Sequence, residues 1–205
     1  MKLNDQIIRW AEELQSLAQA GLYYGKDVYD LDRYQRIREI SAEMMSMRTD
    51  IPVEKITSLF CSDAGYQTPK IDTRAAVFRD GCILLVCENG RWSLPGGWCE
   101  YNLSPAENTV KEAKEEAGLD VTVSRLIAVQ DKDKHNPQPY PFGIIKIFFL
   151  CESRGGRFTE NIETTGIGYF SADCLPVLAE EKCNEDQIRM CFEAYADENW
   201  RVRFD

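Results

Sequence analysis

The sequence has little histidine and little positive charge, and each shortage excludes a class of function. Only one of the 205 residues is a histidine, His135, so a zinc site with histidine ligands at the usual spacing is not expected. Lysine and arginine number 24 against 34 aspartates and glutamates, which gives a net charge of -10. Nucleic acids and anionic membranes bind clustered lysine and arginine. We therefore expect neither as a partner, whereas a small phosphorylated ligand stays compatible if a bound metal supplies positive charge.

Cysteine pairs and long apolar runs are also missing. The eight cysteines are scattered without a CxxC pair, which indicates reduced and mostly buried thiols. Cys82, Cys87 and Cys151 stand inside apolar runs, where cysteine behaves as a small hydrophobe. No run approaches membrane-spanning length, and the first residues lead into an amphipathic pattern rather than a signal peptide. These features predict a cytoplasmic protein.

The most informative stretch is 96–119, a glycine-opened loop that runs into an acidic helix. Residues 95–97, Pro-Gly-Gly, end the preceding strand, because proline lacks an amide donor and glycine reaches backbone angles closed to other residues. Ser104 and Glu107 have the spacing of a capping box, which predicts a helix start. Gly118 is a typical helix stop.

Three glutamates of this helix, Glu112, Glu115 and Glu116, stand at i, i+3 and i+4 and share one face. Carboxylates so close together repel one another, unless a hard divalent cation such as Mg²⁺ or Mn²⁺ lies between them. The alternative is a solvated helix face with i, i+4 ion pairs such as Lys111 to Glu115. The preceding glycine loop favours the metal, because it can bring a bare backbone carbonyl to the same ion.

The stretch resembles the Nudix box, GX5EX7REUXEEXGU, in which U is an aliphatic residue. The positions that match in register are Gly97, Glu112, Glu115, Glu116, Gly118 and Leu119. Leu103 stands at the first Glu of the box, Lys111 stands at its Arg, and Ala113 is a small substitute for the aliphatic residue. In the Nudix family the two replaced positions pair and support the loop rather than hold metal. Their joint loss therefore leaves the metal carboxylates intact and places the chain in a subfamily.

The resemblance implies an α/β protein, an α/β/α sandwich around a mixed sheet, with Mg²⁺ or Mn²⁺ as cofactor. The family's metal positions correspond to the Gly96 carbonyl and to Glu112, Glu115 and Glu116, which would also be catalytic. The wider chain is similar to the bacterial subgroup that hydrolyses X-linked nucleoside diphosphates, which includes CDP-choline and ADP-ribose pyrophosphatases. The flanking stretches that carry this likeness are the amino-terminal helices, 131–135, the FFLC run with 155–156, 163–164 and 175–176.

These relations predict hydrolysis of a small nucleoside diphosphate derivative to a nucleoside monophosphate and a phosphorylated X group. A Nudix fold that senses a nucleotide sugar without cutting it is the alternative. Retention of all three box glutamates favours the enzyme.

Hydrophobic periodicity predicts a small all-α domain over residues 1–66 and a mixed α/β domain over 67–205, which the resemblance identifies as the Nudix domain. Helices are expected from residue 3 to a stop at Gly21, over 30–48 and from Pro52, and near the end of the chain over 184–195. Period-two patterns predict strands at 71–78, 82–87, 92–94, 121–130, 144–151 and 167–170. A polar loop is expected over 131–141 and a turn at 155–156.

The three amino-terminal helices are predicted to be short, and their apolar stripes exceed what such helices can bury among themselves. We therefore expect a homodimer. Helix-turn-helix DNA binding is an alternative for this segment, since residues 52–60 faintly resemble a helix of such motifs. The third helix lacks the basic and amide side chains that read base edges, which disfavours this alternative. Tyr23 and Tyr24 could stack on a ligand base, but core packing is the more common role of such a pair.

The general base is less clear from the sequence. His135, with a near-neutral intrinsic pKa, and Glu163, in a polar turn, are both candidates, with Glu160 and Glu100 as rivals of Glu163. Other Nudix enzymes often place an extra glutamate in the loop that holds Glu163.

Arg74 and Lys146 lie in otherwise apolar strands, where a buried cation needs an anionic partner. We expect Arg74, Lys146 and His135 to bind substrate. Contact with the glutamate cluster, or an edge-strand position with an exposed head group, would explain the two cations as well.

Overall fold

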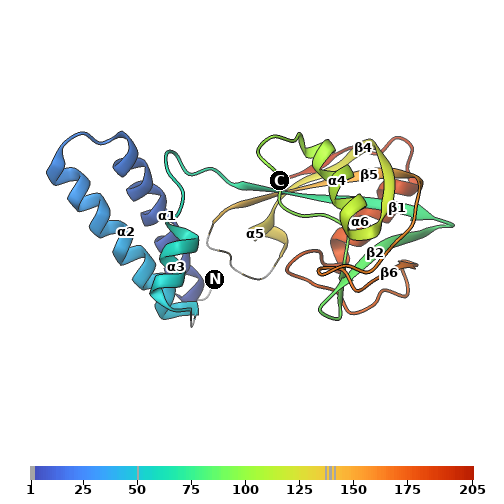
Figure 1. Cartoon of the computed structure of the whole chain (residues 1–205), viewed down its shortest axis with the longest axis horizontal. Helices are drawn as coiled ribbons and strands as arrows, with labels where there is room; N and C mark the ends of the chain where they lie inside the picture. The colour runs from blue at the N-terminus through green and yellow to red at the C-terminus, as the bar shows by residue number, and fades with distance from the viewer. Residues whose placement is uncertain (1–2, 50, 137, 139, 141) are drawn as a thin grey trace. The chain divides into compact units, whose positions relative to one another are not determined.

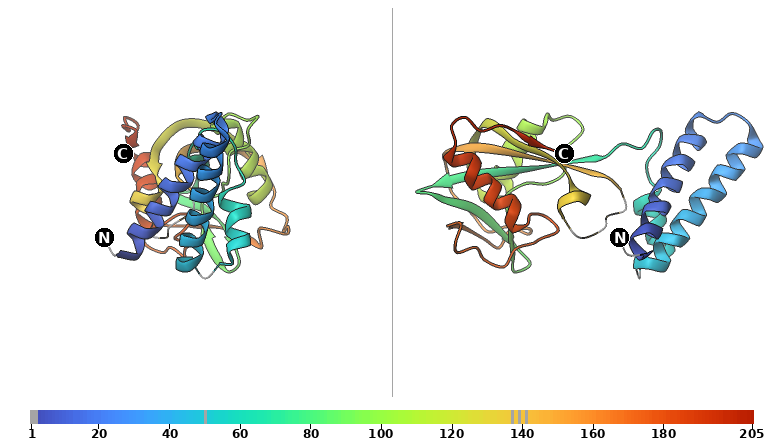
Figure 2. Two further views of the ribbon diagram at one scale, coloured as in Figure 1. Left: turned by 90° about the vertical axis from the view of Figure 1, so that its left-hand side faces the viewer. Right: turned by 180° about the vertical axis from the view of Figure 1, so that it is seen from behind.

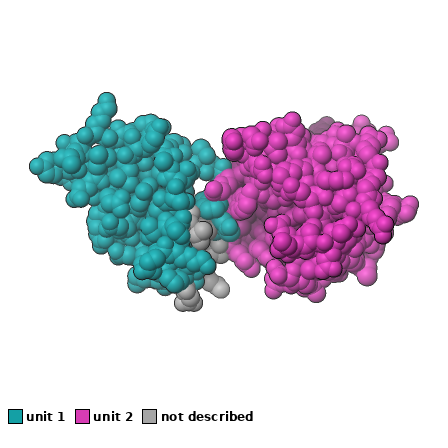
Figure 3. Space-filling model, in the orientation of Figure 1, with its two compact units in different colours: residues 1–69, 139–143 teal, residues 70–138, 144–205 magenta. Residues whose placement is uncertain are grey.

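A computed structural model describes residues 3–49, 51–136, 138, 140 and 142–205. The chain forms two compact units, one of residues 1–69 with 139–143 and the other of residues 70–138 with 144–205 (Figure 3). Within the described ranges, no helix is long and apolar enough to cross a membrane.

The first unit is a helical hairpin with a third, shorter helix. Helices α1 (Leu3–Tyr24) and α2 (Val28–Thr49) lie side by side, and α3 (Val53–Phe60) follows Pro52 as expected (Figures 1 and 2). The buried core consists of Ile8, Ala11, Ala42, Met45, Ile56, Phe60 and Cys61. Two buried side-chain amides of α1 also bind the chain at and after the end of α3, since Gln15 donates to the Phe60 carbonyl at 3.2 Å and Gln19 donates to the Gly65 carbonyl at 3.0 Å.

Three expectations for this unit were wrong. Helices α1 and α2 are long, with 22 residues each. Helix α1 does not stop at Gly21 but continues to Tyr24. Gly21 is an interior residue at which the Tyr34 ring approaches so closely that a Cβ would lie 2.4 Å from it. Tyr23 and Tyr24 are not core residues, because 62% of each is exposed and their rings contact each other edge to face.

The second unit is a mixed sheet between two helices. Its strands run in the order β3-β2-β1-β5-β4-β7, and β6 (Gly166–Phe170) pairs with β2. The others are β1 (Lys70–Arg79), β2 (Cys82–Glu88), β3 (Arg91–Ser93), β4 (Leu119–Asp131), β5 (Ile144–Gly156) and β7 (Arg203–Phe204). Pairs β1·β5 and β4·β7 are parallel and the rest are antiparallel. This confirms the predicted mixed α/β sheet.

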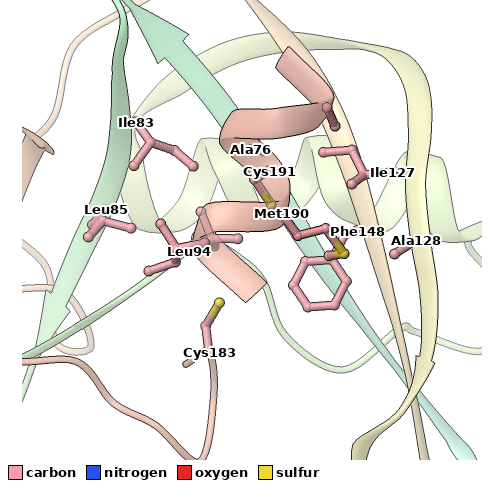
Figure 4. Packing of buried hydrophobic residues seen from close by; sticks show 12 residues of the cluster. Ala76, Ile83, Leu85, Leu94, Ile127, Ala128, Phe148, Cys183, Met190 and Cys191 are labelled. Atoms are coloured by element: carbon pink, nitrogen blue, oxygen red, sulfur yellow. The ribbon is translucent and has the colours of Figure 1, made fainter. Parts of the chain in front are cut away.

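A helix covers each face of the sheet. Helix α6 (Glu185–Ala196) buries Ile188, Cys191 and Ala194 against the sheet. They share a core cluster with Phe148 of β5 and with Leu94, which follows β3 (Figure 4). Figure 2 shows α6 lying across the sheet. Helix α4 (Pro105–Ala117) packs its alanines on the opposite face, in a cluster of Ala75, Val77, Leu84, Val86, Ala113, Ala117, Leu119, Val121 and Cys151. Both faces of the central strands are therefore buried, as their continuous apolar runs indicate.

The two predicted hairpin turns are confirmed. Asp80 and Gly81 have φ of 52° and 74°, and Asn89 and Gly90 have φ of 49° and 76°. Positive φ at both central residues is the type I′ geometry that matches strand twist.

Three local predictions need correction. Residues 155–156 do not form a turn but continue β5, where Gly155 pairs with Asp120 and Gly156 with Leu119. The expected loop 131–141 begins with a helical turn, α5 (Lys132–His135), because the Asp131 side chain accepts from the Asp133 amide at 3.0 Å. Residues 137, 139 and 141 of that loop lie outside the described residues. Strand β7 was not predicted.

All eight cysteines are free. Cys151 is buried as expected, and burial raises its pKa to about 12. Cys82 and Cys87 are only half-buried, because the ends of β2 lie near the rim of the sheet.

Candidate active site

Helix α4 begins and ends where its sequence predicts. The Ser104 hydroxyl accepts from the Glu107 amide at 3.3 Å, and the Glu107 carboxylate accepts from the Ser104 amide at 2.9 Å, which completes a capping box. Gly118 ends the helix in the left-handed conformation, with φ of 69°. A Cβ there would lie 2.2 Å from the Arg157 carbonyl, so the end of the helix contacts backbone directly.

The glycine loop runs antiparallel along β1. Three backbone hydrogen bonds join them, from the amides of Ala75, Thr73 and Cys99 to the carbonyls of Pro95, Gly97 and Ile71. Gly96 has φ of 149°, and a Cβ at this position would lie 1.9 Å from the Thr73 carbonyl oxygen. Only glycine fits this close approach.

Two of the box carboxylates converge on this loop. The Glu116 carboxylate accepts from the Gly96 amide at 2.8 Å, and a Cβ at Gly97 would lie 2.9 Å from Oε2 of Glu112. Burial raises the pKa of Glu116 to about 7, against the lowering effects of the Gly96 hydrogen bond and the Arg74 charge. Burial also raises the pKa of Glu112. The loop and helix therefore hold two carboxylates that ionise reluctantly without a compensating cation.

Glu115 does not contact the glycine loop but lies in a cluster around Lys111, which Glu112 shares. Its carboxylate accepts from Lys111 at 2.6 Å, and Lys111 also contacts Glu112 at 3.4 Å and Glu100 at 3.2 Å. The hydrogen bond with Glu115 raises the pKa of Lys111. Glu100, three residues before Leu103, thus supplies the carboxylate that residue 103 lacks. The Glu–Arg pair of the box motif is thus replaced in this chain by an ion pair between Glu100 and Lys111.

We expect Lys111 and Glu100 to be energetically coupled. In a double-mutant cycle with Lys111→Gln and Glu100→Gln, the coupling should be about 0.5 kcal/mol and should fade in about 1 M salt, because both side chains are partly solvated. Chemical denaturation of the four proteins measures it. The control pair is Lys114 with Asp120, 2.8 Å apart with more than half of each side chain exposed, for which about 0.2 kcal/mol is expected. Equal coupling energies in the two pairs would contradict the proposal that Glu100 replaces the carboxylate missing at residue 103.

Arg74 and Lys146 lie beneath the glycine loop, bound to a carboxylate that sequence reasoning missed. Arg74 Nη2 contacts Asp72 Oδ1 at 2.8 Å, and Lys146 Nζ contacts Asp72 Oδ2 at 3.6 Å. All three residues are at most 5% exposed and lie in β1 and β5, which are central strands. The edge-strand alternative is therefore wrong. The anionic partner is Asp72, which the spacing Asp72-x-Arg74 on one strand face could have indicated.

The two cations also hold main chain. Arg74 Nη1 donates to the Leu94 carbonyl at 3.2 Å, just before the glycine loop. Lys146 donates to the carbonyls of Glu181 and Lys182. Burial and the Arg74 charge lower the pKa of Lys146 to about 8. The cluster therefore braces two loops against the centre of the sheet.

A family model of the NUDIX domain matches residues 69–189. The chain belongs to the Nudix family. A second family model, described as a UDP-X-like, N-terminal oligomerisation domain, matches residues 5–60.

Similar proteins bear names from the same enzyme class. The Bacillus subtilis (strain 168) protein named "Putative ADP-ribose pyrophosphatase YjhB" is 43% identical over 207 residues and covers 100% of both chains. A solved structure of an ADP-ribose pyrophosphatase from Streptococcus suis 89-1591 is 51% identical, covers 67% of this chain and 100% of its own, and has a TM-score of 0.64. A solved UDP-X diphosphatase is 31% identical, covers 99% and 100%, and has a TM-score of 0.63. This chain is therefore a Nudix hydrolase, an enzyme of diphosphate linkages.

The donors beside the Nudix loop fit a hard cation. Among the described residues no group of three or more His, Cys, Asp or Glu side chains is clustered as a metal site. Glu112, which is half-buried, and Glu116, which is buried, nevertheless place two carboxylates beside Gly96 and Gly97. The Leu94, Pro95 and Gly97 carbonyls accept hydrogen bonds, whereas within the described part of the chain the Gly96 carbonyl accepts none. Oxygen ligands of this kind are those that Mg²⁺ and Mn²⁺ prefer.

The contacts that the structure gives His135 and Glu163 are with residues other than Glu112 and Glu116. His135 Nε2 is 2.9 Å from Asp205 Oδ1, so this imidazole is bound at the end of β7. Glu163 is exposed, and its amide donates to Asn161, whose side chain in turn donates to the Glu115 carbonyl at 2.9 Å. The loop with Glu163 is thus attached to the last turn of α4. Both residues stay predictions as substrate-binding and catalytic groups.

Proposed function

We propose that this Nudix hydrolase cleaves the diphosphate of an X-linked nucleoside diphosphate of the ADP-ribose or CDP-choline type. The products would be a nucleoside monophosphate and a phosphorylated X group. The observation that carries the proposal is the convergence of the Glu112 and Glu116 carboxylates on the Gly96-Gly97 backbone, where burial raises the pKa of both. The names of its relatives support a nucleotide substrate.

A diphosphate resists hydrolysis because its negative oxygens repel nucleophiles. The residues that would hold Mg²⁺ or Mn²⁺ are Glu112, Glu116 and the Gly96 carbonyl, with Glu115 as a further carboxylate. When bound, the cation supplies charge neutralisation and water activation. The chain's own residues orient the site, since Arg74 fixes the Leu94 carbonyl and the Gly96 amide fixes the Glu116 carboxylate.

The alternative, a sensor that binds a nucleotide sugar without cutting it, is disfavoured by the same carboxylates. Two adjacent glutamates whose pKa is raised by burial destabilise the metal-free fold, and a site that only binds an anion gains nothing from them. The test is phosphate release from CDP-choline, ADP-ribose and other nucleoside diphosphate derivatives, assayed side by side with Mg²⁺ or Mn²⁺ and alkaline phosphatase as coupling enzyme. We expect release that depends on the metal. Binding of the same compounds without release would establish the sensor instead.

The helical unit is expected to make the protein a homodimer. Large apolar side chains remain exposed on it, namely Trp10, Leu17, Tyr23, Tyr24, Val28, Tyr29, Ile40 and Met47. Trp10 and Leu17 lie seven residues apart on α1, and Ile40 and Met47 lie seven residues apart on α2. Each of the two helices therefore carries an exposed apolar stripe. The match to an oligomerisation domain supports the proposal.

Light scattering of the full chain should give the mass of a dimer, and deletion of residues 1–66 should give a monomer or an insoluble protein. A full-length Leu17→Glu variant should shift the equilibrium toward the monomer, while Glu13→Gln, also exposed on α1, should not. A truncated protein that is soluble and has the same oligomeric state as the full chain would contradict the dimer.

A further inference from the structure

Helix α4 carries a buried side-chain amide one turn before its candidate metal carboxylates. Asn108 is 0% exposed; its Oδ1 accepts from the Glu100 amide at 3.1 Å, and its Nδ2 donates to Thr73 Oγ1 at 3.0 Å. Because a backbone N–H can only donate, the atom that faces Glu100 must be the oxygen, which fixes the orientation of the amide. One side chain of α4 therefore binds both β1 and the loop that follows Gly97.

The contact between Thr73 and Asn108 lies on the α4 face of the sheet. Ala75, two residues further along β1, packs in one cluster with the alanines of α4, and alternate residues of a strand share a face. Asn108 lies four residues before Glu112 and eight before Glu116, on the same stripe of the helix. The amide and the candidate metal carboxylates thus face the same side of the same loop.

Other side chains of α4 that contact this loop are less suited to hold it. Lys111 and Glu100 form an ion pair, but their side chains are 29% and 47% exposed, and solvated ion pairs contribute little. The Glu116 carboxylate accepts from the Gly96 amide but is itself a candidate metal ligand. The Asn108 amide is uncharged and fully buried, and a buried polar group that loses its partner destabilises the fold. Its two hydrogen bonds therefore resist displacement of the loop.

We infer that Asn108 is a positioning residue, which sets the distance between the glycine loop and the carboxylates of Glu112 and Glu116. The inference rests on the proposed function, because these groups are the candidate metal ligands. Replacing a residue that orients metal ligands typically lowers metal affinity or activity about 10- to 100-fold. Asn108 acts through Thr73 on β1 and through Glu100 on the loop, so loss of either bond loosens the site without removing a ligand.

The experiment removes the bond to β1 with Thr73→Val, which keeps the branched shape of the side chain but cannot accept from the amide. Calorimetry should show that Mn²⁺ binds Thr73→Val about 10-fold more weakly than the parent chain, and kcat should fall about as much with little change of KM. Thr73→Ser keeps the hydroxyl and should restore both. The matched control is Thr109→Val, since Thr109 is also 0% exposed but its hydroxyl donates to the Pro105 carbonyl within α4. Its Mn²⁺ affinity should stay within about twofold of the parent value, because no contact with the loop is lost.

Amide hydrogen exchange adds a measurement that needs neither metal nor substrate. The Cys99 amide, next to Glu100 in the loop, donates to the Ile71 carbonyl at 2.8 Å. This amide should exchange faster in Thr73→Val than in Thr109→Val, because a loop that is held less firmly opens more often. If circular dichroism shows Thr73→Val to be misfolded, Thr73→Ala tests the same bond.

An equal loss of Mn²⁺ affinity in Thr73→Val and Thr109→Val would overturn the inference, since it would reflect only the loss of a buried hydroxyl. Unchanged Mn²⁺ affinity and unchanged Cys99 exchange in Thr73→Val would overturn it as well. Hydrolysis assays keep the two proposals apart. A parent chain that binds Mn²⁺ but cleaves no diphosphate contradicts the proposed function alone, whereas a parent chain that binds no Mn²⁺ contradicts both.

Discussion

Replacement of Glu116 by glutamine is expected to lower kcat/KM about 10³-fold, because a metal centre contributes several kcal/mol of transition-state stabilisation and glutamine removes a charged ligand. Glu112→Gln should act similarly. Both carboxylates border the Gly96-Gly97 backbone rather than the apolar core, so circular dichroism should be unchanged. The comparison variant is Glu115→Gln, whose carboxylate contacts Lys111 and should cost less. Near-normal turnover in Glu112→Gln or Glu116→Gln with an intact fold would contradict the assignment of these residues as metal ligands.

Glu116→Gln should also stabilise the metal-free protein against unfolding. The pKa of Glu116 is raised from 4.5 to about 7 in the folded state, so the folded protein prefers the protonated form. Its contribution to the free energy of unfolding is full below pH 4.5 and is lost as the pH rises through 7, a fall of about 3 kcal/mol. Glutamine mimics the neutral form at every pH. In EDTA at pH 8, Glu116→Gln should therefore unfold at higher denaturant concentration than the parent chain, and at pH 4 the two should be similar.

The second large effect is expected at Glu163. A general base replaced by an isosteric amide typically costs about 10² to 10⁴ in kcat, and Glu163→Gln should fall in that range at saturating Mg²⁺. The Asn161 hydrogen bond attaches the loop of Glu163 to the last turn of α4, although Glu163 does not belong to the helix. A loop position suits a base that must approach water. Unlike Glu116→Gln, this variant should keep its metal affinity.

Glu160→Gln, in the same loop and exposed like Glu163, is the matched control and should retain full activity. A loss of kcat below about threefold in Glu163→Gln at every pH between 7 and 9 would show that Glu163 is an ordinary solvent-exposed residue, since replacing a general base lowers kcat far more. Glu160 and His135 would then be the next candidates for the base.

Local chemistry made the Nudix helix predictable. A capping serine, a glycine stop and an i, i+3, i+4 set of glutamates each act within one or two turns, and the structure places Ser104 and Gly118 in those roles. The type I′ turns at Asp80-Gly81 and Asn89-Gly90 are equally local. These features need no knowledge of what lies across the sheet.

Features that depend on register could not be predicted in the same way. Asp72 became visible as the partner of Lys146 only through the parallel pairing of β1 with β5. Glu100 reaches Lys111 because the glycine loop folds back on α4, where Asn108 also accepts from the Glu100 amide at 3.1 Å. Strand β7 is two residues long, and its pairing with β4 comes from the tertiary fold rather than from a pattern of its own. The three box glutamates also differ for a spatial reason, since Glu112 and Glu116 lie against the glycine loop whereas the Glu115 side chain is exposed and contacts Lys111.

The glycine at the end of α4 has a consequence for how the site can evolve. Gly118 lies against the Arg157 carbonyl, and its own carbonyl accepts from the Arg157 amide at 3.1 Å, so main-chain contacts anchor the helix there beside the Asn161 side chain, which binds the Glu115 carbonyl. At its other end the Ser104 cap and the Asn108 amide also bind backbone groups. The positions of Glu112 and Glu116 along the loop thus depend largely on backbone contacts at the two ends of the helix, which persist when the side chains of the contacted residues change. Ala113 and Ala117, which pack fully buried on the sheet, are the positions at which a larger side chain would shift both carboxylates.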